Sequence, residues 1–234
     1  MSEDATLIKA SLADWASRDR AAALRLFVPA ARTLAASSRI ALGHALRESA
    51  WMGSDARVSE AKSAWWLEEL ALAERGQPRH PLTSFLAQQA ESPNFAQLSR
   101  ELTRLRASSP DDEAGGVLAA LGDLERQLWF GASSPNPAAC ATRARAAWVD
   151  VLQRRGRFEL RDQQNSAARS AVLFHSTALL AAPASDGWTA ARRAQALSWI
   201  EVRDGRMADG RAARLREVWV VWRAVQAARW HGPE

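Results

Sequence analysis

The sequence predicts an all-α protein, and three observations support this. Alanine, leucine, arginine and glutamate, which favour helices, are abundant, whereas tyrosine is absent and isoleucine occurs only at positions 8, 40 and 200. Apolar residues recur every three or four positions, as on one face of a helix. Short stretches that contain proline or glycine separate these periodic segments. A chain of 234 residues can bury a sizeable core within a single domain.

The expected helices follow one another along the chain with short connections. In the first part they span residues 4–17, a segment from about Asp19 to Pro29, 33–51, 58–75, a short helix after Pro81, 95–106 and 108–130. In the second part they span residues 138–154, 166–182, 188–202 and 211–230. The stretch 131–137 contains serine and two prolines, so it is the best candidate for a hinge within a single domain of residues 1–234.

Several of these helices carry tryptophan on a predicted apolar face, and the first sets Leu7, Ile8, Leu12 and Trp15 on one side. The apolar positions of the fourth helix are Val58, Ala61, Trp65, Trp66, Leu70, Leu72 and Ala73, and its polar remainder is Lys62, Glu68, Glu69, Glu74 and Arg75. Ser54 or Ser59 is expected to cap its start, and Gly76 followed by Pro78 to end it. The last helix is expected to align Leu215, Val218, Trp222 and Val225 in one stripe.

Composition and charge bound the function and the compartment. The single Cys140 excludes an internal disulfide, and neither a secretory signal nor a membrane span is expected, so we expect a reducing, cytoplasmic location. The formal net charge is +5 and the pI about 10.7. Because the arginines are interleaved with acids along the chain, nucleic-acid binding is not expected.

The segment from Ala61 to Leu82 resembles part of the squalene/phytoene synthase family, the head-to-head prenyl synthases. The resemblance is carried by Trp65-Trp66, then Glu68-Glu69-Leu70, then Gly76-Gln-Pro-Arg-His-Pro81. Phe27-Val-Pro29 and the run from Arg39 to Leu46 look like the preceding part of that family, so the resemblance covers the first third of the chain. It implies an isoprenoid-synthase-like bundle of about eight to ten helices around a central core or cavity.

The chain departs from that family at the residues that perform its chemistry. The family holds magnesium ions on two DxxxD motifs across the cavity, and these ions help a substrate diphosphate to leave. The first motif region here offers only Glu48 and Asp55, and later helices offer Asp150 and Asp162 as isolated acids. The resemblance therefore implies a degenerate, non-catalytic member with no catalytic residue and no metal or other cofactor. Magnesium would be required only if the chain is nevertheless an active prenyltransferase that condenses isoprenoid diphosphates.

The remaining candidate residues leave several functions open. The candidate ligand pocket comprises Arg39, Arg47, Glu48, Trp66, Glu69, Arg79 and His80. An open cavity would be lined by Leu46, Trp65 or Trp66, and Phe174. With Arg39, Arg47 or Arg79 at its mouth, it would bind an isoprenoid or prenyl diphosphate. A collapsed core would favour a protein partner or an assembly role, and exposed tryptophans on the last helix would mark the contact surface. Trp219, Trp222 and Trp230 are expected in the core, with peripheral membrane contact as the alternative. His44 could face the cavity, His175 is expected in the core, and Asp111 to Glu113 are expected to cap a helix.

Overall fold

The computed structural model describes residues 3–18, 33–51, 55–108, 116–130, 190, 194 and 218–226. By its internal contacts the chain divides into two compact units. The first comprises Met1–Ala23 and Arg32–Pro135, and the second comprises Leu24–Ala31 and Asn136–Glu234. The helices expected near Asp19, over 138–154 and over 166–182 lie outside the described residues, as do the hinge at 131–137 and the cap at Asp111 to Glu113. The single domain and its hinge therefore stay predictions.

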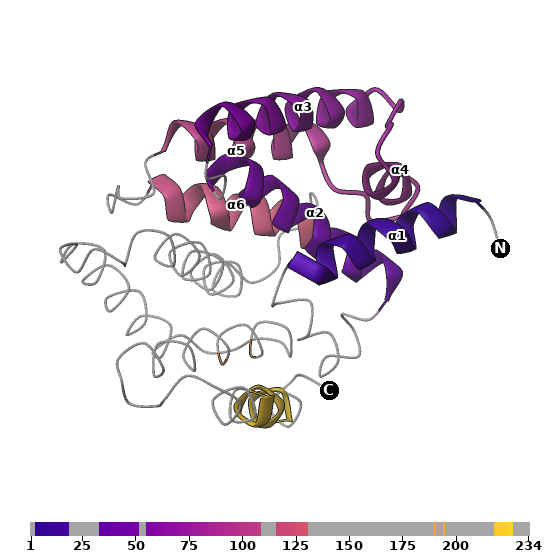
Figure 1. Cartoon of the computed structure of the whole chain (residues 1–234), viewed down its shortest axis with the longest axis vertical. Coiled ribbons are helices and arrows are strands. Elements are labelled where there is room, and N and C mark those ends of the chain that lie inside the picture. Colours follow the sequence, from indigo (N-terminus) through magenta and orange to yellow (C-terminus); the bar gives the residue numbers. More distant parts are fainter. Residues whose placement is uncertain are drawn as a thin grey trace. The chain divides into compact units, whose positions relative to one another are not determined.

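The first unit is built from helices, which confirms the all-α prediction (Figure 1). They are α1 (Glu3–Arg18), α2 (Leu34–Trp51), α3 (Ala56–Glu74), α4 (Pro81–Ala87), α5 (Phe95–Ala107) and α6 (Gly116–Phe130). In the second unit residues 218–226 are helical, as are residues 190 and 194. The ranges that the structure describes contain no β-strand. Each helix of the first unit matches a segment with the predicted three- or four-residue periodicity.

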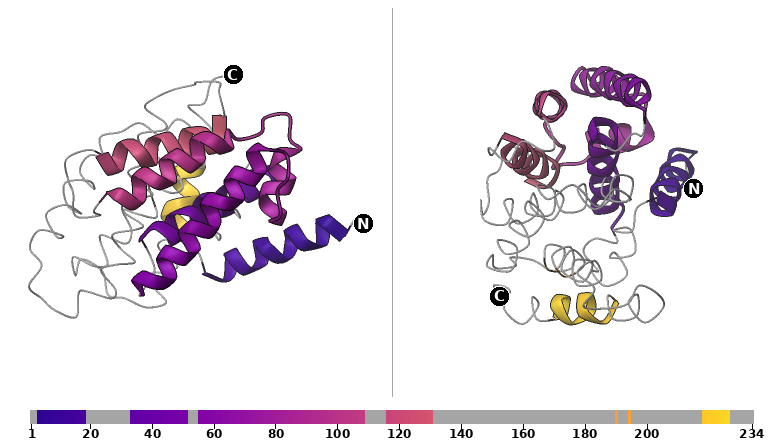
Figure 2. Two further views of the ribbon diagram at one scale, coloured as in Figure 1. Left: turned by 90° about the horizontal axis from the view of Figure 1, so that it is seen from above. Right: turned by 60° about the vertical axis from the view of Figure 1, so that its left-hand side comes forward.

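Helix α2 is the central helix of the first unit, because it packs against each of the other five (Figure 2). Its apolar residues Ile40, Leu42 and Leu46 are buried. At Gly43 it approaches α6 closely: a Cβ atom added there would lie 2.8 Å from Leu128 Cδ1. The lack of a side chain at Gly43 therefore allows the two helices to touch.

Helices α5 and α6 follow the sequence pattern closely and lie side by side (Figure 2). Both present a leucine stripe that is fully or almost fully buried: Leu98, Leu102 and Leu105 from α5, and Leu121, Leu124 and Leu128 from α6. Burying a leucine side chain contributes about 2 kcal/mol relative to leaving it in water, so these stripes are a large part of the core of the first unit. Asn94 is the N-cap of α5, since its Oδ1 accepts a hydrogen bond from Gln97 N at 2.8 Å.

The apolar face predicted for α3 is wrong in part. Trp66, Leu70 and Ala73 are buried together with Ser63 and Glu69. Val58 and Trp65 are instead 48% and 41% exposed, Ala61 is exposed as well, and Leu72 is half-buried. The predicted face is wide, and neighbouring helices cover only the side centred on Trp66 and Leu70. Glu69, which was expected on the polar side, consequently lies inside.

A side-chain cap begins α3, and a glycine in the left-handed conformation ends it. Asp55, rather than Ser54 or Ser59, is the N-cap, and its side chain accepts a hydrogen bond from Arg57 N at 2.8 Å. At the other end Gly76 adopts a φ of +73°, the left-handed conformation that glycine accepts most readily. Gly76 N then donates to Ala73 O, and Gln77 N donates to Leu72 O. This Schellman turn confirms the predicted stop and sends the chain back toward α4.

Apolar residues of α1 and of the second unit also differ from their predicted positions. Leu7 of α1 was placed with Ile8, Leu12 and Trp15 on one buried side, but it is 48% exposed, whereas the other three are buried. In the second unit Val225 is buried as predicted, and Val221 is buried beside it on the same side of the helix.

Val218 and Trp222, which were expected in the same stripe as Val225, are exposed together with Trp219. The expectation of core packing is therefore wrong for Trp219 and Trp222, while Trp230 lies outside the described residues.

Candidate functional site

The Glu69 carboxylate is the centre of a polar network between α3 and α4. Its side chain is fully buried. Oε1 accepts hydrogen bonds from Arg79 N and His80 N, both at 2.9 Å, and from Thr83 Oγ1 at 2.5 Å. Three donors on one carboxylate oxygen offset much of the cost of removing the charge from water.

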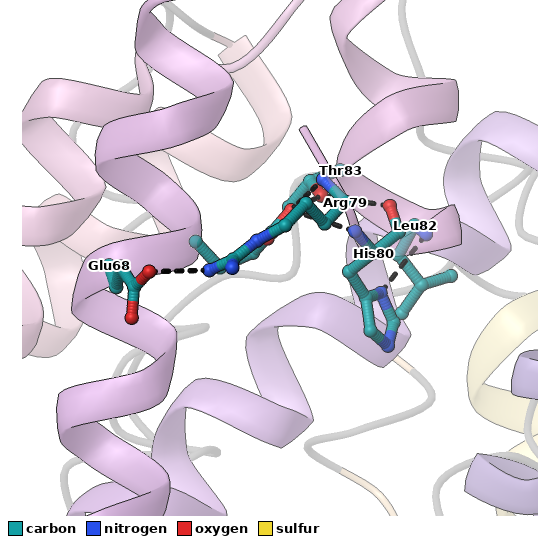
Figure 3. A network of polar contacts seen from close by, with 6 residues as sticks. Glu68, Arg79, His80, Leu82 and Thr83 are labelled. Atoms are coloured by element: carbon teal, nitrogen blue, oxygen red, sulfur yellow. Dashed lines mark hydrogen bonds and ion pairs between the residues drawn. The ribbon is translucent and has the colours of Figure 1, made fainter. Parts of the chain in front are cut away.

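Arg79 reaches across this network with its guanidinium group (Figure 3). Its Nε lies 3.7 Å from Glu69 Oε2, which makes no hydrogen bond to any described residue. Its Nη2 donates to the exposed Glu68 Oε1 at 2.7 Å. Arg79 therefore bridges one buried and one exposed carboxylate of α3, and both contacts are internal to the protein.

His80 connects the network to the two tryptophans of α3. Its ring centroid lies 5.0 Å from that of Trp66 and 5.8 Å from that of Trp65. Its Nδ1 accepts a hydrogen bond from Leu82 N at 3.1 Å, so that His80 is the N-cap of α4 and Pro81 occupies the first turn. Burial lowers the pKa of His80 below its usual value, and the nearby Glu69 carboxylate opposes this shift. A neutral ring suits the cap, because Nδ1 can accept a hydrogen bond only while it carries no proton.

Arg47 lies in a second buried contact, between α2 and α6. Its Nη1 donates to Glu125 Oε1 at 2.8 Å, and both side chains are almost fully buried. Gly43, one turn earlier, leaves space for the guanidinium group, since a Cβ there would approach Arg47 Nη1 to 3.2 Å. The arginine predicted at a cavity mouth therefore pairs with a core carboxylate.

Arg39 and Glu48 of α2 have partners elsewhere. Arg39 Nη2 donates to the Glu91 carbonyl oxygen at 2.6 Å in the connection between α4 and α5. Glu48 Oε1 accepts from Lys62 Nζ at 3.1 Å, and His44 Nε2 lies 3.6 Å from Glu48 Oε2. Arg39 thus holds α2 to the connection between α4 and α5, and Glu48 holds α2 to α3.

The structure brings four of the seven predicted pocket residues into mutual contact and separates the other three. Trp66, Glu69, Arg79 and His80 meet between α3 and α4. Arg39, Arg47 and Glu48 each make a different contact, with Glu91, Glu125 and Lys62.

Thr83 and Glu125 were not predicted. Glu125 could have been noticed, because it stands four residues after Leu121 and three before Leu128, on the apolar stripe itself.

Other kinds of site find no support in the part of the chain that the structure describes. No three His, Cys, Asp or Glu side chains gather there as they would around a metal ion. No helix among these residues is both long enough and apolar enough to cross a bilayer. Comparison of the chain with family models, curated proteins and solved structures gives no significant match.

Removing the Glu69 carboxylate should destabilise the first unit strongly. In Glu69→Ala the two backbone amides and the Thr83 hydroxyl lose their acceptor, and we expect a loss of about 3 kcal/mol in the free energy of unfolding. The matched control is Glu68→Ala, which removes only the exposed contact with Arg79 and should cost less than about 1 kcal/mol. Urea unfolding followed by far-UV circular dichroism measures both. Equal losses in the two variants would contradict the central role of Glu69.

Protonation of His80 should lower the free energy of unfolding at acidic pH. Because its pKa in the folded state lies below the usual histidine value of 6.5, the unfolded chain binds the proton more readily. The free energy of unfolding should therefore fall as the pH is lowered through 6.5, and this contribution should level off below the folded-state pKa. In His80→Asn the asparagine can still cap α4 but does not titrate. Unfolding curves between neutral and acidic pH should show a smaller decrease for this variant, and equal slopes would contradict the assignment.

Proposed function

We propose that this chain is a non-catalytic protein of the squalene/phytoene synthase type that binds a protein partner or supports an assembly. The observation that carries the proposal is that Glu69 occupies the donors which the loop after α3 could offer to a diphosphate. Arg79 N and His80 N both point to its Oε1. An anionic substrate would have to displace a buried carboxylate that belongs to the fold.

Two of the acids that could replace a lost metal motif, Glu48 and Asp55, have structural partners as well, while Asp150 and Asp162 lie outside the described residues. Glu48 pairs with Lys62, and Asp55 caps α3. A magnesium ion needs several oxygen ligands in octahedral geometry, which these two separately engaged carboxylates do not provide. Both observations favour a binding role over prenyl transfer.

The outer side of α3 supplies a surface suited to a protein partner. Val58, Ala61 and Trp65 recur at steps of three and four residues, and all three are exposed. Their side chains therefore form an apolar stripe along roughly two turns, flanked by the charged Arg57 and Lys62. An exposed apolar stripe with a polar border is typical of helix-mediated protein contacts.

We expect that the protein neither converts a prenyl diphosphate into product nor binds one. Incubation with farnesyl diphosphate and Mg²⁺ should release no pyrophosphate, with an active squalene synthase as the positive control. Tryptophan emission should also stay unchanged when farnesyl diphosphate is titrated in. Pyrophosphate release with a new hydrocarbon would overturn the proposal. So would a saturable quench that Trp66→Phe and Arg79→Ala both weaken.

The α3 stripe should capture its partner in the native cells. A photoreactive amino acid in place of Ala61, between Val58 and Trp65, should form an adduct of one defined mass on illumination. The matched control carries the same amino acid in place of Arg100, which is exposed on α5. Trp65→Ser should reduce the adduct several-fold, because it removes the largest apolar side chain of the stripe. Absence of an adduct, or equal labelling from positions 61 and 100, would count against this surface.

A further inference from the structure

The described helix of the second unit exposes an unusual cluster of large apolar side chains. Val218, Trp219 and Trp222 are 46%, 53% and 48% exposed. Their spacing of one, three and four residues places them on one side of this helix, which is drawn in yellow in Figure 1. Val221 and Val225, on another side of the same helix, are 1% exposed. The helix therefore has one buried side and one side that exposes large apolar residues.

An arginine accompanies this cluster. The Arg223 guanidinium carbon lies 5.3 Å from the centre of the Trp219 ring, within the range of a cation–π contact. Arg223 is itself exposed. The surface therefore combines indole rings with a positive charge held directly beside them.

The sequence around the cluster is strongly basic. Residues 211–230 contain five arginines, at positions 211, 214, 216, 223 and 229, against the single acid Glu217. The formal net charge of this segment is therefore +4.

We propose that this helix surface, with Trp219, Trp222 and Arg223 at its centre, docks on the surface of an anionic phospholipid membrane. Indole rings are amphipathic and favour the boundary between headgroups and acyl chains. Basic side chains near the surface gain from the negative potential of anionic lipids. Apolar insertion and charge attraction are each weak alone, but together they hold a peripheral protein at a membrane. A protein partner would have to match both the indole cluster and the local excess of positive charge.

Vesicle sedimentation with the full chain tests this proposal. Vesicles in which about a third of the phosphatidylcholine is replaced by phosphatidylglycerol should retain the protein, and pure phosphatidylcholine vesicles should not. Raising the salt from about 0.1 M to about 0.5 M should release most of it, because screening shortens the reach of the charges. Brominated lipids should quench part of the tryptophan emission on binding.

Variants separate the contributions of the surface. The double variant Trp219→Ser/Trp222→Ser should lower the vesicle partition coefficient by about tenfold or more, and Arg223→Glu by several-fold. The matched control is Leu7→Ser, which changes an exposed large apolar residue of α1 in the first unit and should leave partitioning unchanged. Circular dichroism checks that each variant is folded.

Three results would overturn the membrane proposal. The first is equal binding to neutral and anionic vesicles, and the second is unchanged binding of the folded double variant. The third is self-association of the chain, lost in the double variant, with no vesicle binding, since it would make the surface a protein interface.

Discussion

The first unit depends on how it neutralises carboxylates inside its core. An ionised carboxylate removed from water is costly unless hydrogen bonds and an opposite charge compensate it. Three buried glutamates meet this condition, each with an arginine close by: Glu69 with Arg79, Glu101 with Arg104, and Glu125 with Arg47. These pairs involve α2, α3, α5 and α6, so most of the helices of the unit share the constraint. Arginine suits this role because its planar group keeps its charge and offers several donors.

The same constraint explains why the residues of the candidate site suggest a ligand pocket in the sequence but form an internal polar network in the structure. Charged residues next to tryptophans are what an anionic ligand site requires, and Arg79, His80 and Trp66 supply them. Here the anion is a side chain of the protein, since Glu69 accepts from both loop amides. The polar residues of this region therefore fix the position of α4 against α3, and their chemistry is that of a stable fold.

The sequence allowed the helices to be predicted because each has periodic apolar residues and a local stop. Leu98, Leu102 and Leu105 illustrate this, as does the left-handed Gly76. It did not allow the buried side of α3 to be predicted, because Val58 and Trp65 are as apolar as the buried Leu70. Which part of a wide apolar face is covered depends on the neighbouring helices, and their angles are not encoded in local spacing.

The buried glutamates were partly predictable. Glu69 stands three residues after Trp66 and four before Ala73, on the stripe that proved to be buried. Such a position indicates a buried acid, but its partners cannot be found from spacing. Arg79 approaches Glu69 only because the Schellman turn after α3 reverses the chain, and Arg47 meets Glu125 across 78 residues of sequence.

These separations have a consequence for the order in which the unit folds. The partners of Glu69 lie only 10 to 14 residues along the chain, so closing this loop costs little conformational entropy. The pair between Arg47 and Glu125 closes a far longer loop and also requires α6 to be in place. The hairpin of α3 and α4 is therefore suited to be an early folding nucleus that already contains its polar contacts, onto which the more distant helices assemble.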